Sequence, residues 1–160
     1  MNHPKEEQTL VLLKPDALQR NLLGEIIHRF EIRGLKIVGM KMIHLNDALL
    51  DEHYAHIKDK PFFPGNKEFM SSYPVVAIVL SGIKAVNVVR AMLGPTKGYD
   101  APPGTIRGDF SMSTQANMAH ASDSLEAAKA EIKRFFTVKE LYSYKKLDFD
   151  LSFSEDEKAV

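Results

Sequence analysis

The sequence has no cysteine among its 160 residues, and its charges cancel. Without cysteine there can be no disulfide framework, no thiolate zinc site and no cysteine nucleophile, which fits a reducing compartment. The 21 Lys and Arg residues equal the 21 Asp and Glu residues, so no overall field attracts nucleic acid or anionic lipid. Any anion-binding site must therefore be built locally from a few cationic side chains.

Long apolar runs are also missing. The longest uninterrupted run, VVAIVL from Val75, is far too short to span a bilayer, and the opening MNHPKEEQ lacks the apolar core of a signal peptide. We therefore expect a cytoplasmic location and no membrane partner. Hydrophobic residues make up 44% of the chain, enough to fill one core, so we predict a single domain over residues 1–160.

The hydrophobic pattern alternates between two periods. Strand-like composition recurs at 9–14, at 35–45, at 73–82 and in a short run ending at His120. Helical spacing occupies 21–33, 83–93 and 124–136, and a further helix follows the cap residue Asp47 until KPFFPG ends it. The order is strand, helix, strand, strand, helix, strand. It predicts an α+β, ferredoxin-like fold (β-α-β-β-α-β), an antiparallel sheet with helices on one face plus additional helices.

Three glycines and one long segment qualify this outline. Gly34 and Gly94 are typical of helix ends, and Gly39 marks an expected bulge or close approach within a strand. Residues 94–113 show no long period of either kind and contain three prolines and four glycines. We expect a long loop there, and loops of that length in small domains are usually functional or disordered.

The long loop carries the best candidates for anion binding. Arg90, Thr96 and Arg107 come together with glycine-freed backbone amides, and an arginine fork can hold two phosphate oxygens at once. The alternative is that Arg90 covers a helix face and Arg107 pairs with Asp109. Lys14, at the end of a strand, can line the same crevice or lie extended at a sheet edge. No P-loop or G-x-G-x-x-G segment is present.

HYAHIKDKPFF contains two histidines and two phenylalanines. His53 and His56 are three residues apart, as metal ligands can be, but no third ligand is placed by a motif, which favours surface histidines. Phe62 and Phe63 are typical of a core, although their proline-flanked position leaves stacking on a base open.

The segment NMAHASDS places His120 at a strand end before a helix. A neutral imidazole is a competent nucleophile at neutral pH. Glu131, on the following helix, can reach back to one ring nitrogen and so present the other. Ser122 can hold that carboxylate or cap the helix. The alternative is a half-buried histidine with satisfied hydrogen bonds and no chemistry.

Taken together, five segments resemble nucleoside diphosphate kinases in order and spacing. They are LVLLKPDALQR, HYAHIKDKPFF, VRAMLGPT, PPGTIRGDF and NMAHASDS. GTIRGDF and N-x-x-H-x-S-D-S are the most diagnostic. The resemblance runs from about Thr9 to Tyr144, so we expect a core at about 9–144 and a divergent tail at 145–160.

The resemblance implies reversible transfer of the γ-phosphate from a nucleoside triphosphate such as ATP to a nucleoside diphosphate, serving nucleotide homeostasis. The implied route is ping-pong through a phosphohistidine at His120, oriented by Glu131 and Ser122. Mg²⁺ is implied on the nucleotide phosphates, with no direct protein ligand, and the chain is expected to form a homo-oligomer, a hexamer or tetramer built from dimers. The implied nucleotide-binding residues are Lys14, Tyr54, Phe62, Arg90, Thr96, Arg107 and Asn117.

Several positions depart from the family pattern. Ala17 and Ala121 stand where the family commonly has glycine, and a methyl group fits there if φ is negative. Asn66 replaces a typically apolar residue near the base, and the TKGYDAPPG loop also differs. Two other readings are a silent, nucleotide-binding family member and a ferredoxin-like RNA-binding module. The first is disfavoured because all the histidine and phosphate positions are filled, and the second because the chain lacks a basic surplus and aromatic RNA-binding strands.

Overall fold

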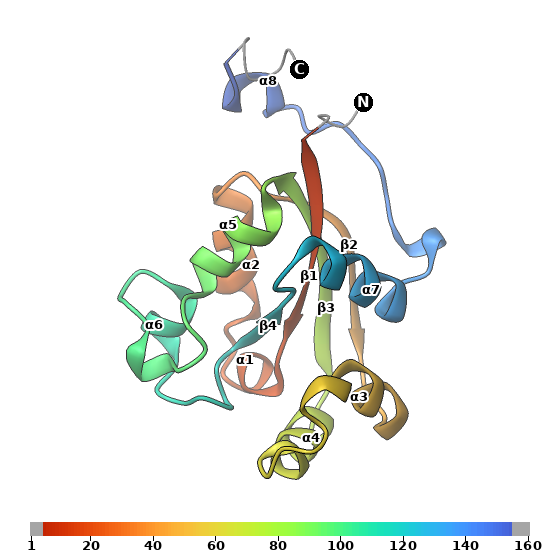
Figure 1. The fold of residues 1–160 in the computed structure, drawn as a ribbon. Coiled ribbons are helices and arrows are strands. Elements are labelled where there is room, and N and C mark those ends of the chain that lie inside the picture. Colours follow the sequence, from red (N-terminus) through yellow and green to blue (C-terminus); the bar gives the residue numbers. More distant parts are fainter. Residues whose placement is uncertain (1–4, 155–160) are drawn as a thin grey trace.

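A computed structural model describes residues 5–154. Its centre is a four-stranded sheet in the order β2-β3-β1-β4, and every neighbouring pair is antiparallel (Figure 1). This topology is the predicted ferredoxin-like arrangement. The strands are β1 (Glu6–Leu13), β2 (Lys36–Ile43), β3 (Val75–Ile83) and β4 (Ala119–Ala121).

The helices lie between and after the strands. The α-helices are α1 (Pro15–Gln19), α2 (Leu23–Ile32), α3 (Asp47–His53), α4 (Phe63–Ser71), α5 (Ala85–Leu93), α6 (Ile106–Phe110), α7 (Leu125–Phe135) and α8 (Phe149–Ser152). The 3-10 helices are η1 (Ala55–Ile57), η2 (Gly98–Asp100) and η3 (Val138–Glu140). In the described part of the chain, no helix has the length and apolar character needed to cross a membrane.

The sheet is buried on both faces. Val11 and Leu13 of β1 pack in one core with residues of α2 and α5, whereas Leu10 and Leu12 pack in a second core with α3, α4 and α7. Alternate residues of a strand point to opposite faces, so a strand covered on both sides is continuously apolar. Helices α2 and α5 therefore occupy one face as predicted, and α3, α4 and α7 cover the other (Figure 1).

The glycine predictions are confirmed. The β2–β3 register shifts between Ile37 and Gly39, and a Cβ at Gly39 would lie 2.8 Å from the Leu141 side chain. Gly34 and Gly94 have φ of 92° and 78°, the left-handed backbone that ends α2 and α5.

Other local predictions are wrong. Helix α3 is capped by Asn46, whose side chain accepts a hydrogen bond from the Leu49 amide, and Asp47 is its first residue. KPFFPG does not end the helical region, because α4 begins at Phe63. The expected long loop contains η2 and α6.

The C-terminal segment lies along β2 before reaching α8. The Tyr142 amide donates to the Val38 carbonyl (2.7 Å), and the Tyr144 hydroxyl donates to the Ile37 carbonyl (2.7 Å). Phe153 reaches a cavity that also includes Glu6 at the start of β1. The last part of the predicted tail, 155–160, lies outside the described residues.

Candidate active site

A cleft of about 880 Å³ opens beside the C-terminal end of β1, between α3, α4, α7 and the segment that joins α5 to β4. Nine of the ten residues predicted for the site line it, and Ser122 lies fully buried behind it. The lining residues among the ten are Lys14, Tyr54, Phe62, Arg90, Thr96, Arg107, Asn117, His120 and Glu131.

His120 lies on β4 opposite Leu12 of β1. Its Nε2 is 3.0 Å from Glu131 Oε1, and the Ser122 hydroxyl donates to Glu131 Oε2 (2.6 Å). Burial raises the pKa of Glu131, but the hydrogen bonds and charge of His120 and the Ser122 hydroxyl outweigh it and leave the pKa lowered. An ionised carboxylate can only accept a hydrogen bond, so the contact with Glu131 assigns the ring proton of His120 to Nε2 and leaves a free lone pair on Nδ1.

Ser122 holds the carboxylate and does not cap the helix. The cap of α7 is Ser124, whose side chain accepts from the Ala127 amide. Ser122 also accepts a hydrogen bond from the Leu10 amide (3.2 Å), so the hydroxyl is fixed from both sides. Of the two roles that the sequence left open for Ser122, the structure selects the one that orients Glu131.

Lys14 is buried in the cleft wall, with 7% of its surface exposed. Its Nζ donates to Asn117 Oδ1 (2.7 Å) and to the Gln115 carbonyl (3.1 Å). Burial and the nearby Arg107 charge lower the pKa of Lys14 to about 8, although Asp16 opposes them. The alternative of an extended lysine at a sheet edge is therefore wrong.

Arg107 is buried at the start of α6. Burial, and then repulsion from Arg90, lower the pKa of Arg107 to about 10. Asp109 pairs with Arg29 (2.6 Å), so the alternative of an Arg107–Asp109 pair is wrong. The guanidinium is oriented by backbone carbonyls, which accept from all three nitrogens: those of Gly94 (2.7 Å), Asn117 (3.2 Å) and Ala119 (2.6 Å).

These cations have no carboxylate of their own. In the described part of the chain, neither Lys14 nor Arg107 forms an ion pair, and Asn117 joins the cluster to the Thr96 carbonyl (2.8 Å). Buried cations that repel one another favour an anion between them. The cleft thus has the local grouping of cations that an anion site needs in a chain of zero net charge.

The two phenylalanines separate as core and cleft. Phe63 is 6% exposed and packs in the core, whereas Phe62 is 58% exposed at the mouth of the cleft. Tyr54 is buried in the cleft wall, and burial raises its pKa to about 12. An exposed ring beside a polar cavity can stack on a planar ligand.

His53 is a cleft residue that the sequence analysis misassigned. His56 is exposed as predicted, but His53 is only 4% exposed, and its ring meets the His120 ring edge-on with centroids 4.6 Å apart. Burial, and then repulsion from His120, lower the pKa of His53 to about 3. A signal was available, because His53 lies three residues after the buried Leu50 and so shares its helix face.

Both alanines that replace glycine fit their backbones. Ala17 lies in α1 and Ala121 in β4, and neither has positive φ. A strained residue near the nucleophile is Met118, with φ of 70°, two positions before His120. Its amide donates to Asp16 Oδ2 (2.9 Å), and its carbonyl accepts from the Lys14 amide (2.9 Å). Met118 thus ties the approach to β4 to the end of β1.

The model of one protein family, nucleoside diphosphate kinase, matches residues 7–141. The chain belongs to the nucleoside diphosphate kinase family. The nucleoside diphosphate kinase of Parabacteroides distasonis is 51% identical over 151 residues, which cover 94% of this chain and 99% of that protein.

Solved structures agree with this assignment. A nucleoside diphosphate kinase from Halobacterium salinarum in complex with CDP has a TM-score of 0.91 and 41% identity, covering 93% of this chain and 99% of its own. A transition-state mimic of the Borrelia burgdorferi enzyme, with bound vanadate and ADP, has a TM-score of 0.85 and 34% identity, covering 90% and 95%. The chain is accordingly a phosphotransferase of this family that binds nucleotides and uses nucleoside triphosphates as phosphoryl donors.

Proposed function

We propose that His120 is the residue that carries the phosphoryl group between the two nucleotides. The observation that supports this most directly is the chain of contacts from Ser122 to Glu131 to His120 Nε2, at the wall of a cleft that also contains Lys14 and Arg107. This chain of contacts directs a neutral imidazole nitrogen of His120 into a site suited to phosphates.

The positions of the side chains support the proposed binding roles. Arg90, Thr96 and Arg107 bind the phosphates, with Arg107 held in a single orientation by its three backbone carbonyls. Lys14 and Asn117 bind the sugar hydroxyl and the phosphate region, and Tyr54 closes the wall. Phe62 stacks on the base, and because every base has a π-face, little discrimination among bases is expected.

The reaction runs in two mirrored halves. His120 Nδ1 attacks the γ-phosphorus, the P–N bond forms as the bond to the β-phosphate oxygen breaks, and the diphosphate leaves. Glu131 stabilises the positive charge that develops on the ring through its contact with Nε2. A second diphosphate then enters and takes the phosphoryl group by the reverse steps. Positioning and charge stabilisation are the main demands of phosphoryl transfer, and the cleft meets both.

Mg²⁺ would arrive on the nucleotide phosphates, where it neutralises part of their charge. The few carboxylates that line the cleft fit an ion carried by the nucleotide better than an ion held entirely by protein ligands. Glu52 pairs with Arg134, and Glu131 is held by Ser122 and His120. Asp123, exposed at the rim, is the remaining lining carboxylate that can hold such an ion through water.

Labelling with γ-³²P ATP tests the role of His120. The wild type should retain acid-labile, base-stable label, and the label should leave when a nucleoside diphosphate is added. His120→Ala should carry none. Label that persists in His120→Ala would show that the nucleophile lies elsewhere, and a folded wild type without label would sink the phosphohistidine route.

Three broader expectations stay predictions. They are the division into a core at about 9–144 and a tail, the cytoplasmic location, and the homo-oligomer built from dimers. Sedimentation of the purified chain measures the assembly directly.

A further inference from the structure

Two histidines and a carboxylate converge beside the nucleophile. Within residues 5–154, His53, His120 and Glu131 each offer one ligand atom, and these atoms lie within 4.8 Å of one another. They come from α3, β4 and α7. Glu131 Oε1 is central, at 3.0 Å from His120 Nε2 and 3.8 Å from His53 Nδ1.

The donor set has the composition of a zinc site. Two imidazole nitrogens and one carboxylate oxygen are a known three-ligand set for Zn²⁺, with water as the fourth ligand. Imidazole donors select zinc, copper and nickel over magnesium, which prefers oxygen ligands and retains its waters. The nucleotide's Mg²⁺ is therefore a poor competitor for this cluster.

The surroundings hold two of the ligands in place. The second oxygen of Glu131 accepts from Ser122 (2.6 Å), an outer contact of the kind that orients metal-binding carboxylates. The His53 ring is fixed by edge-on contacts with Tyr54, at 4.6 Å, and Phe135, at 5.1 Å. The cluster also borders the cleft, so an ion can reach it from solvent.

We propose that His53, His120 and Glu131 form an inhibitory site for a borderline-soft divalent cation, with Zn²⁺ as the fitting example. The cation takes the lone pair of His120 Nε2, so the single ring proton moves from Nε2 to Nδ1 and the ring stays a neutral imidazole. Protonated Nδ1 has no free lone pair with which to attack phosphorus, so phosphorylation slows. Binding depends only on the three ligands, whereas the inhibition rests on the proposed role of His120.

One neighbour opposes the cation. Arg134 Nη1 is 3.4 Å from His53 Nδ1, although its guanidinium is already paired with Glu52 (2.7 Å). The positive charge repels a metal ion, and the side chain must turn away for His53 to coordinate. Arg134→Gln should therefore tighten metal binding, a gain of affinity that a purely structural role for His53 does not predict.

Cobalt(II) gives a test that does not depend on activity. The metal-free protein is titrated with Co²⁺ in the presence of Mg²⁺, and visible d–d absorption is recorded. The wild type should bind one ion with the intense bands of a four-coordinate site, and Zn²⁺ should displace it. His53→Gln should weaken binding at least about tenfold, the lower end of the loss that even outer contacts cause. The matched control is His56→Gln, which changes the exposed histidine three residues away and should bind normally.

Several results would overturn the proposal. One is the absence of four-coordinate bands in the folded wild type, and another is equal Co²⁺ affinity in the wild type and His53→Gln. If His53→Gln does not fold, Glu131→Gln gives the same comparison. Phosphorylation of His120 by MgATP is then measured with and without Zn²⁺. Binding without slower phosphorylation would overturn the inhibition, and a protein that binds Co²⁺ but never accepts label would refute the proposed function and leave the metal site standing.

Discussion

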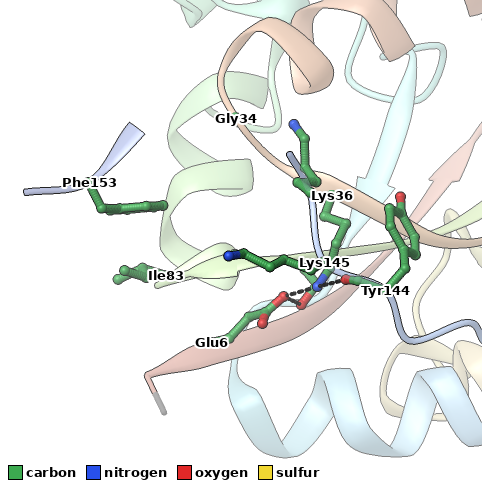
Figure 2. A pocket seen from close by; sticks show the side chains of 10 residues that line it. Glu6, Gly34, Lys36, Ile83, Tyr144, Lys145 and Phe153 are labelled. Carbon is green, nitrogen blue, oxygen red and sulfur yellow. Dashed lines mark hydrogen bonds and ion pairs between the residues drawn. The ribbon is translucent and has the colours of Figure 1, made fainter. Parts of the chain in front are cut away.

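Two lysines at opposite ends of the sheet are equally buried, but their positive charges have different partners. Lys14 follows the end of β1, Lys36 begins β2 beside the start of β1, and each is 7% exposed. Lys36 Nζ lies 2.7 Å from Glu6 Oε1 and donates to the Tyr144 carbonyl (3.1 Å), as Figure 2 shows. Lys14 instead donates to neutral oxygens and faces Arg107.

Under the proposed function, this difference separates a structural cation, Lys36, from a nucleotide-binding one, Lys14. A buried ion pair satisfies its charge within the fold, and removing one partner strands the other. A buried cation among other cations is satisfied only when an anion arrives. The cavity around Lys36, about 50 Å³, is also lined by Lys145 and Lys146, so the number of lysines in a cavity does not by itself identify an anion site.

Matched substitutions should distinguish the two lysines by their effects on activity and on stability. Lys14→Met should lower kcat/KM for phosphoryl transfer by about 10²- to 10³-fold, the usual loss when a preorganised donor is removed. Lys36→Met should leave kcat/KM close to wild type. It should cost about 1–3 kcal/mol of unfolding free energy, because the partly buried Glu6 loses this ion pair and keeps the hydrogen bond from Ser81.

Coupled enzyme assays and urea unfolding of both variants make the comparison. Lys14→Met should unfold at a urea concentration no lower than the wild type, since it removes an uncompensated buried charge. A folded Lys36→Met variant that loses as much activity as Lys14→Met would show that the two ends of the sheet are not functionally distinct.

The same contrast holds for two serines. Ser122 donates to Glu131 in the site, and Ser81 donates to Glu6 at the other end of the sheet, both at 2.6 Å. Both Ser→Ala variants should lose about 1–3 kcal/mol of stability. Only Ser122→Ala should lower the rate of His120 phosphorylation, by about tenfold, because Glu131 loses the contact that orients it. Rapid-quench labelling measures that rate, and equal rates in both variants would refute the orienting role.

Much of the fold was predictable because its signals are local. The apolar run of β3 and the glycines at 34 and 94 determine an element or its end from neighbouring residues alone. Helices α1 and α4 were missed because KPDA and KPFFPG look like turns. Each of these two helices has a proline in its first turn, where a backbone N–H has no partner within the helix and its absence costs nothing.

The site was predictable as a set of residues and only partly as an arrangement. Local patterns supplied His120, Glu131 and Arg107 as candidates, the family resemblance implied their roles, and the structure places them at one cleft. The helix face that His53 shares with Leu50 indicated its burial, but its contacts with His120 and Phe135 depend on α3 packing against β4 and α7, which no local spacing reveals. The role of Ser122, which holds Glu131 and does not cap a helix, likewise depends on a contact with Leu10, 112 residues away in sequence.

The smallest expected effect is a pH dependence that arises from Lys14 and sharpens its contrast with Lys36. Its pKa is lowered from 10.5 to about 8, so between those values the unfolded chain binds more protons than the folded one. Stability should therefore rise across that window, as the penalty for burying the cation disappears, and Lys14→Met should lack this rise. Activity should move the other way. From about pH 7 to about pH 8.5 the charged fraction of Lys14 falls about fourfold, and kcat/KM, which reports the free enzyme, should fall with it. A flat kcat/KM profile over this range would show that the positive charge on Lys14 does not contribute to nucleotide capture.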